Sequence, residues 1–237
     1  MPGKLFLIPT ILAEGTAESM LAPVILSTVG GLEHFLCENI RTARRFVSLL
    51  KVHPSVELLK FDLLDKDTPE EKLPELFSPL MRGADMGLLS ESGSPAVADP
   101  GALAVNYAHR QGITVIPLPG PSSIVLALMA SGLNGQQFAF HGYLPVDAPE
   151  CAAEIRRLET ESREKNQTQI FIETPYRNNK LLAQLLKHLS EDTLLCIGAN
   201  ITSQGESIRS KKIQEWKNEV PVLEKVPITF LFLAVGK

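Results

Sequence analysis

The chain has 237 residues, of which 44% are apolar and 21% charged, so it is long enough for one large or two small folded domains. This composition excludes a disordered or collagen-like chain. With 23 basic and 27 acidic side chains the net charge is −4, which argues against a protein that coats nucleic acid by bulk charge but leaves room for one specific RNA site.

Short β-rich runs alternate with helical patterns through the first half of the chain. The predicted strands cover residues 4–8, 34–37, 56–61, 86–89 and 114–118, and amphipathic helices between them include residues 42–52 and 70–82. Such alternation is typical of crossover units, which build a parallel sheet. The run Leu5-Phe-Leu-Ile8 is continuously apolar, as expected for a strand buried on both faces. The first half therefore predicts an α/β fold with a doubly wound parallel sheet.

The proline-rich stretch at residues 117–121 ends this pattern, because proline removes backbone donors and Gly120 permits a sharp turn. We place a domain boundary there, which gives an N-terminal domain of residues 1–119 and a C-terminal domain of residues 120–237. In the second domain, strands are predicted near 138–143, 169–173, 194–198 and 229–235, and helices near 124–130, 151–165, 178–189 and 210–217. This order predicts a mixed α/β domain.

The three cysteines, Cys37, Cys151 and Cys196, show neither a disulfide framework nor zinc spacing, and the five histidines show no metal spacing. We therefore expect no metal and a reducing, cytoplasmic location. The longest apolar stretches, 124–130 and 228–235, are too short to cross a bilayer, so no transmembrane helix is expected. The sequence also lacks the G-x-S-x-G and G-x-x-x-x-G-K-[ST] motifs, which argues against serine hydrolases and P-loop proteins.

Small residues follow the fourth predicted strand in the segment Ser90-Glu-Ser-Gly-Ser-Pro95. This segment is expected at the carboxyl end of the sheet, where open α/β folds bind ligands, and Gly93 would let a ligand approach the backbone. A plain strand-to-helix turn is the alternative interpretation. Asp99 is predicted to cap the next helix. Residues 119–123 precede another helix and could either hold an anion or act as a hinge.

Two further pairs of opposite charges follow predicted strands. Glu38 and Arg41 lie just after the second strand, where both could face one cleft, although a surface ion pair is the alternative. Glu173 and Arg177 end a strand in the second half, where a functional and a capping role are equally open.

Several motifs occur in a fixed order along the chain. The motif S-D-A-G-T-P-x-x-x-D-P-G is matched at equal spacing by Ser90, Gly93, Pro95, Asp99, Pro100 and Gly101. P-G-P-S follows at residues 119–122, S-G-L at 131–133 and F-x-F-x-G-[FY]-L-P at 138–145. E-S-P-x-R is represented by Glu173, Pro175 and Arg177, and A-E-D-T-R by Glu38 and Arg41. Over nearly the whole chain, this order resembles the tetrapyrrole methylase superfamily, and within it the branch of small-subunit ribosomal RNA ribose 2′-O-methyltransferases.

The chain also departs from that branch. The P-I-G-N loop after the first strand is here Pro9-Thr-Ile-Leu12 and has lost its glycine, and Asn39 replaces the aspartate of A-E-D-T-R. The E-L-T-K of a later strand appears as Asn200-Ile-Thr-Ser203. The chain ends at Lys237 without the small C-terminal extension of the full-length enzymes, so we expect RNA docking that is weaker or different. The sequence therefore resembles a short, divergent member.

The resemblance implies a homodimer of two-domain subunits with a Rossmann-like N-terminal domain. It also implies that S-adenosylmethionine binds in the cleft between the domains, against the loops after the fourth and fifth strands. The residues implied nearest the cofactor, several of them through backbone atoms, are Pro9, Ser92, Gly93, Ala96, Ser122, Ser123, Ile172, Ala199 and Thr229.

The expected activity is S-adenosylmethionine-dependent methyl transfer, with a ribosomal RNA ribose 2′-hydroxyl as the expected acceptor and with no DNA or membrane partner. Such a hydroxyl has a high pKa and needs a base or a cation nearby, for which Glu38 and Arg41 are the candidate catalytic residues. If the acceptor is a carbon or nitrogen atom, Glu38 would only orient Arg41. Two alternatives stay open: a catalytically degenerate cofactor-binding module, suggested by the lost glycine, and a methylase of a small tetrapyrrole-like substrate.

Overall fold

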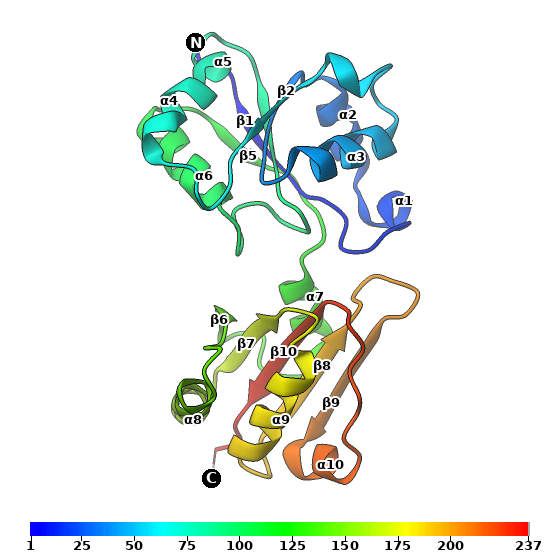
Figure 1. Cartoon of the computed structure of the whole chain (residues 1–237), viewed down its shortest axis with the longest axis vertical. Helices are drawn as coiled ribbons and strands as arrows, with labels where there is room; N and C mark the ends of the chain where they lie inside the picture. Colours follow the sequence, from blue (N-terminus) through cyan, green and yellow to red (C-terminus); the bar gives the residue numbers. More distant parts are fainter. Residues whose placement is uncertain (237) are drawn as a thin grey trace. The chain divides into compact units, whose positions relative to one another are not determined.

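The computed structural model describes residues 1–236, which form two compact units (Figure 1). The first unit is Met1–Ser122 and the second begins at Ser123, so the proline-rich stretch belongs to the first unit. Each unit has its own sheet and its own buried core. No helix within residues 1–236 combines the length and the apolar character that a membrane span requires.

The first unit is built on a parallel sheet. Its strands are β1 (Leu5–Ile8), β2 (His34–Cys37), β3 (Lys60–Leu63), β4 (Met86–Leu89) and β5 (Val115–Pro117), in the order β3-β2-β4-β1-β5. All neighbouring strands run parallel. The central strand β4 is buried at every residue, which explains its continuous apolar sequence. The predicted doubly wound parallel sheet is confirmed.

Helices cover both faces of this sheet. They are α1 (Ala17–Met20), α2 (Pro23–Gly30), α3 (Ile40–Leu50), α4 (Leu73–Leu76), α5 (Ser78–Met81) and α6 (Gly101–Arg110), with 3₁₀ turns at Val56–Leu58 and Glu70–Lys72. Helices α2 and α3 pack with Phe35 and Phe61 in one core, whereas α4, α5 and α6 pack with Leu36 and Met86 in another (Figure 1). Adjacent residues of β2 thus point into opposite cores, as alternation along a strand requires.

The second unit contains a mixed sheet. Its strands are β6 (Phe138–Tyr143), β7 (Thr168–Glu173), β8 (Leu194–Ala199), β9 (Ser207–Lys212) and β10 (Ile228–Leu233), in the order β6-β7-β10-β8-β9. Among the described strand pairs of this second sheet, only β6–β7 is parallel. Helices α8 (Ala148–Lys165), α9 (Asn178–His188) and α10 (Ile213–Asn218) share a core with one face. Helix α7 (Ser123–Ser131) contacts strands β8, β9 and β10. The predicted mixed α/β domain is confirmed.

Some local predictions were wrong, each for a physical reason. The strand predicted at 56–61 begins only at Lys60, because Ser55 Oγ accepts a hydrogen bond from Glu57 N and starts a 3₁₀ turn. The helix predicted at 70–82 is broken into short pieces, since Pro74 and Pro79 cannot donate backbone hydrogen bonds. The sequence predicts no strand at β9 and a helix from residue 210, because β9 is polar and largely exposed and so lacks an apolar strand pattern; the helix begins only at Ile213.

Candidate functional site

The carboxyl edge of the parallel sheet gathers residues from separate parts of the sequence. Pro9 follows β1, Glu38 follows β2 and Ser90 follows β4, while residues 118–122 follow β5. Because the strands are parallel, all these positions lie at one edge of the first unit. Ligands of open α/β sheets bind at this edge, close to the point where the strand order reverses.

Three loops at this edge are hydrogen-bonded into one assembly. Thr10 N donates to the carbonyl of Gly93 at 2.9 Å, and Ser90 Oγ donates to the same oxygen at 3.1 Å. Ser94 Oγ donates to the carbonyl of Pro121 at 3.3 Å. The loops after β1, β4 and β5 therefore support one another, as a preorganised binding site requires.

Two glycines permit these loops to approach closely. A Cβ atom on Gly120 would lie 2.2 Å from Pro9 Cγ, so only glycine fits against that ring. Gly93 has φ +75°, and a Cβ there would lie 3.1 Å from Leu12 Cδ2 and 3.3 Å from the Pro121 carbonyl oxygen. Leu12, which stands where the family motif ends in asparagine, therefore covers one side of Gly93.

The loop after β4 holds its backbone in an unusual conformation. Ala96 and Ala98 have φ of 64° and 61°, a left-handed region that alanine rarely adopts. Asp99 Oδ1 maintains this shape by accepting hydrogen bonds from Ala96 N at 2.7 Å and Gly101 N at 2.8 Å. The residue that precedes α6 is Pro100, so the prediction that Asp99 is the N-cap was wrong by one position; Asp99 instead fixes the loop and accepts a hydrogen bond from the first helical residue. Strain of this kind is concentrated at ligand-binding and catalytic sites.

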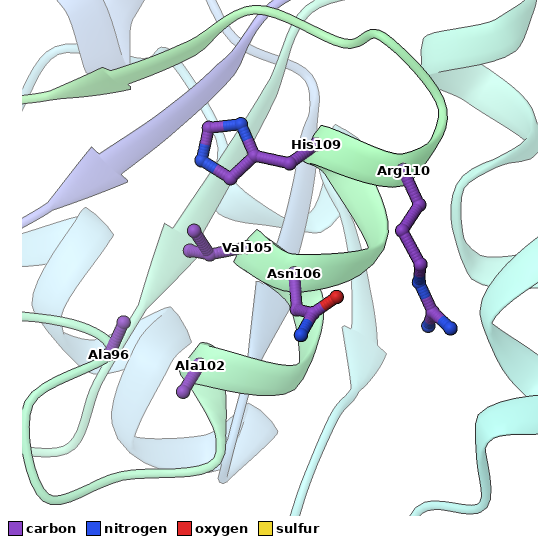
Figure 2. A pocket seen from close by; sticks show the side chains of 6 residues that line it. All are labelled: Ala96, Ala102, Val105, Asn106, His109 and Arg110. Carbon is purple, nitrogen blue, oxygen red and sulfur yellow. The ribbon is translucent and has the colours of Figure 1, made fainter.

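Two hollows adjoin this strained loop. One of about 680 Å³ is lined by Ala96, Ala102, Val105, Asn106, His109 and Arg110, with the side chains of α6 along its wall (Figure 2). A second, of about 540 Å³, is lined by Asp65, Lys66, Ala96, Ala98, Asp99, Pro100, Ala102 and Leu103. Both are shallow and open to solvent, so neither encloses a small molecule by itself. Of the residues predicted to bind the cofactor, Ala96 lines both hollows and the others line neither.

Glu38 lies at the same edge and has a perturbed acidity. Burial raises the pKa of its half-buried carboxyl, and the negative charges of Asp99, Glu91 and Asp65 raise it further. A carboxylate with a raised pKa is a stronger base once it ionises. The structure therefore places one predicted catalytic residue in an environment suited to accepting a proton.

Arg41 is placed differently from Glu38. It lies exposed in the first turn of α3, and no ion pair joins it to Glu38 within residues 1–236. Asn39 begins this helix, because its Oδ1 accepts hydrogen bonds from Arg41 N and Thr42 N at 3.0 and 3.3 Å. The idea that Glu38 orients Arg41 by direct pairing has no support in this geometry.

Cys37 ends strand β2 immediately before Glu38. Its side chain is buried, and burial together with the charge of Asp62 raises the pKa of the thiol to about 12. The thiol is therefore protonated at neutral pH and is a poor nucleophile.

The second unit brings together only part of its predicted cofactor set. Thr229 of β10 pairs directly with Ile172 of β7, so their side chains share one face of the sheet. Ala199 of β8 pairs with Ile228 and packs against the core beneath α8, α9 and α10. Its side chain therefore lies on the opposite face, and only its backbone could share a ligand with Thr229 and Ile172. Ser123 begins α7.

Thr10, whose hydroxyl lies at the carboxyl edge of the parallel sheet, was not singled out from the sequence. Thr10 is buried, and its Oγ1 has no hydrogen-bond partner within residues 1–236. A buried hydroxyl of this kind is normally satisfied, so its position beside Gly93 is suited to a bound polar group. The position directly after an apolar strand was the available signal.

Comparison with known proteins identifies the family. The family of tetrapyrrole (corrin/porphyrin) methylases matches residues 31–217. The chain belongs to this family. A uroporphyrin III C-methyltransferase from Thermus thermophilus has the same fold, with a TM-score of 0.58 and 15% identity, over 98% of this chain and 97% of that protein.

Two relatives with closer sequences are each named ribosomal RNA small subunit methyltransferase I. The Vibrio cholerae protein is 30% identical over 171 residues, which cover 72% of this chain and 58% of the relative. The Haemophilus influenzae protein is 31% identical over 180 residues, which cover 75% of this chain and 62% of the relative. The chain thus aligns with less than two thirds of the length of these relatives.

Proposed function

We propose that this methylase transfers a methyl group from S-adenosylmethionine to a ribose 2′-hydroxyl of small-subunit ribosomal RNA. Family membership supports the methyl transfer, and the names of the similar proteins support the RNA substrate. One observation carries the proposal. The strained loop at Ala96 and Ala98 and the Glu38 carboxyl, whose pKa is raised, lie at the same edge of the parallel sheet. The homodimer and the cytoplasmic location stay predictions.

The residues of the first unit fit a cofactor of this kind. The left-handed backbone at Ala96 lies beside two open hollows, and the unpartnered hydroxyl of Thr10 offers a hydrogen bond to a bound group. Ser92, Gly93, Ala96 and Ser122 would hold the cofactor, and Pro9 would support their loops. The proposal also includes Ser123, Ile172, Thr229 and the backbone of Ala199. When bound, the cofactor supplies an electrophilic methyl carbon on a sulfonium.

The chain's own residues then have two tasks, which are alignment and proton removal. The interlocked loops hold their backbone donors in fixed positions, which favours an in-line approach of the acceptor oxygen. Glu38 accepts the proton of the 2′-hydroxyl, helped by its partial burial. Arg41, which is exposed and carries no carboxylate partner within residues 1–236, stabilises the developing oxyanion or a neighbouring phosphate.

A catalytically degenerate cofactor-binding module is the second candidate, and Leu12 is the observation that favours it. Its side chain approaches Gly93 at the position where the family loop carries smaller or polar residues. If the Leu12 side chain fills the space beside Gly93, the chain would still bind part of the cofactor but would leave no space for the methyl acceptor.

The test combines cofactor binding with methyl transfer. Calorimetry should show S-adenosylmethionine binding to the purified chain, and a labelled methyl group should appear in undermodified small ribosomal subunits but not in fully modified ones. Binding without transfer to RNA or to small acceptors would favour the degenerate module. Transfer only to a tetrapyrrole would refute the RNA substrate.

A further inference from the structure

A highly exposed tyrosine lies in the turn after strand β7. Tyr176 is 82% exposed, and Lys225 Nζ lies 5.2 Å from the centre of its ring. The cation occupies one ring face in a favourable cation–π arrangement. At this exposure, the rest of the ring is open to a second planar group.

The turn that carries Tyr176 is held in place by its neighbours. Glu173 Oε1 accepts a hydrogen bond from Thr174 N at 2.6 Å, and Glu173 Oε2 pairs with Arg177 Nη2 at 2.8 Å. Arg177 N also donates to the Thr174 carbonyl at 2.9 Å. The Glu173 side chain is fully buried and the Arg177 side chain is 30% exposed, so this ion pair is partly shielded from solvent. A fixed turn reduces the entropy lost when its ring binds a partner.

A second set of contacts holds Lys225 beside the ring. Asn178 Nδ2 donates to the Val226 carbonyl at 2.9 Å. Asn179 Nδ2 donates to the Leu223 carbonyl at 2.7 Å, and Leu223 N donates back to Asn179 Oδ1 at 2.8 Å. These bonds attach the segment around Lys225 to the first turn of α9, so the aromatic and cationic groups come from two elements joined by hydrogen bonds.

The charges of Lys225 and of the first turn of α9 complement a polyanion. Lys180 and Lys225 have no ion-pair partner within residues 1–236, and the first turn of α9 contains no acidic residue. Glu173 is compensated by Arg177, which leaves the exposed Glu224 as the acidic neighbour of Lys225 in sequence. An exposed aromatic face with uncompensated ammonium groups has the chemistry of a single-stranded RNA surface, where unpaired bases stack and phosphates meet cations.

We propose that Tyr176, Lys180 and Lys225 form a docking surface for an unpaired stretch of RNA. A base stacks on the open side of the Tyr176 ring, and the two ammonium groups contact flanking phosphates. This inference rests on the proposed function for its RNA substrate, and it adds Tyr176, Lys180 and Lys225 of the second unit as residues that bind that RNA.

The test measures RNA affinity without cofactor, using fluorescence anisotropy of a labelled unstructured oligoribonucleotide and the full chain. Tyr176→Ala should weaken binding about 5- to 150-fold, the range expected for the loss of one base–aromatic stack. Tyr176→Phe should bind like the wild type, because it keeps the ring. Lys225→Gln should lower the salt dependence, with a slope in log Kd against log salt smaller by about 0.7.

Tyr143→Ala is the matched control, since Tyr143 is the other exposed tyrosine of the second unit, at 58%. It should leave RNA affinity unchanged. The docking surface is wrong if the wild type binds no RNA, if Tyr176→Ala binds as tightly as the wild type, or if Tyr176→Phe is as weak as Tyr176→Ala. A tyrosine that docks a protein instead would give the second of these results.

A methyl-transfer assay separates this inference from the proposed function. Tyr176→Ala should raise KM for RNA while kcat and S-adenosylmethionine affinity stay unchanged. If RNA binds through Tyr176 but receives no methyl group, the proposed function fails and the docking surface stands. If the wild type methylates RNA and Tyr176→Ala has an unchanged KM, the docking surface fails and the function stands.

Discussion

At the scale of single residues, Glu38 combines partial burial with three neighbouring carboxylates, and both effects raise its pKa. The protonated form is therefore favoured in the folded protein compared with the unfolded chain. Stability is lost as pH rises through the interval between the ordinary glutamate pKa and the raised one. The ionised Glu38 carboxylate is also the proposed base. Its ionisation at neutral pH therefore lowers the stability of the fold and at the same time allows it to accept the proton of the acceptor.

Glu38→Gln should reveal this linkage in chemical denaturation across pH. The unfolding free energy of the variant minus that of the wild type should grow through the interval defined above and level off at higher pH. A difference for Glu38→Gln that stays flat or falls with pH would contradict the raised pKa.

The same substitution should change the pH profile of methyl transfer. Wild-type kcat should increase as Glu38 ionises, with an apparent pKa above the ordinary glutamate value. Glu38→Gln should lower kcat about 10²- to 10⁴-fold, the usual contribution of a general base, and its kcat should no longer rise with pH in this range. If kcat of the variant still rises with pH as in the wild type, a group other than Glu38 is the base.

Gly120 tests the contact between the loops after β1 and β5. Gly120→Ala would place a methyl group 2.2 Å from Pro9 Cγ, so we expect a loss of about 1–3 kcal/mol in unfolding free energy, measured with urea. Gly31→Ala is the control, because its added Cβ would meet its nearest atom at an ordinary 3.5 Å. Equal stability of the two variants would mean that the loops do not pack in this way.

At the scale of elements, helix α3 depends on its first residue. Asn39→Ala removes the acceptor for two backbone N–H groups and should cost about 0.5–2 kcal/mol, measured by urea denaturation. Asn39→Asp, which restores the family residue, keeps an acceptor and should be nearly neutral. If both variants are equally destabilised, capping is not the role of Asn39.

Apolar strands were the elements that the sequence predicted best. The predictions at 34–37, 86–89 and 138–143 match β2, β4 and β6, since continuous or alternating apolar residues are strong strand signals. Helices α1 and α2 were missed because α1 is only four residues long and α2 has apolar residues around its whole circumference. The apolar spacing of residues 70–82 predicts one helix, but the two prolines divide this segment into short helices.

The sequence predicted only those parts of the candidate site that follow from the carboxyl ends of parallel strands meeting at one edge of a sheet. On this basis Glu38 and Ser90 were expected at the same edge, where both are observed. The hydrogen bonds of Asp99 and the cover that Leu12 gives Gly93 arise from loop geometry, which depends on contacts between distant segments. The separation of Ala199 from Ile172 follows from strand register, which a single sequence does not specify.

At the scale of the whole molecule, two units with different sheets carry the residues of one proposed reaction. The first supplies the strained loop and Glu38, and the second supplies Thr229, Ile172 and the aromatic surface at Tyr176. A ribose 2′-hydroxyl as acceptor is the central claim, because a base with the properties of Glu38 is needed only for an acceptor with a high pKa.

The position of the transferred methyl group tests this claim most directly. Ribosomal RNA labelled by the enzyme and S-adenosylmethionine is hydrolysed in alkali, which requires a free 2′-hydroxyl to cleave each linkage. The account predicts that the label is recovered in alkali-resistant dinucleotides, because a 2′-O-methyl group blocks cleavage. Label recovered in mononucleotides would place the methyl group on a base and would contradict the account.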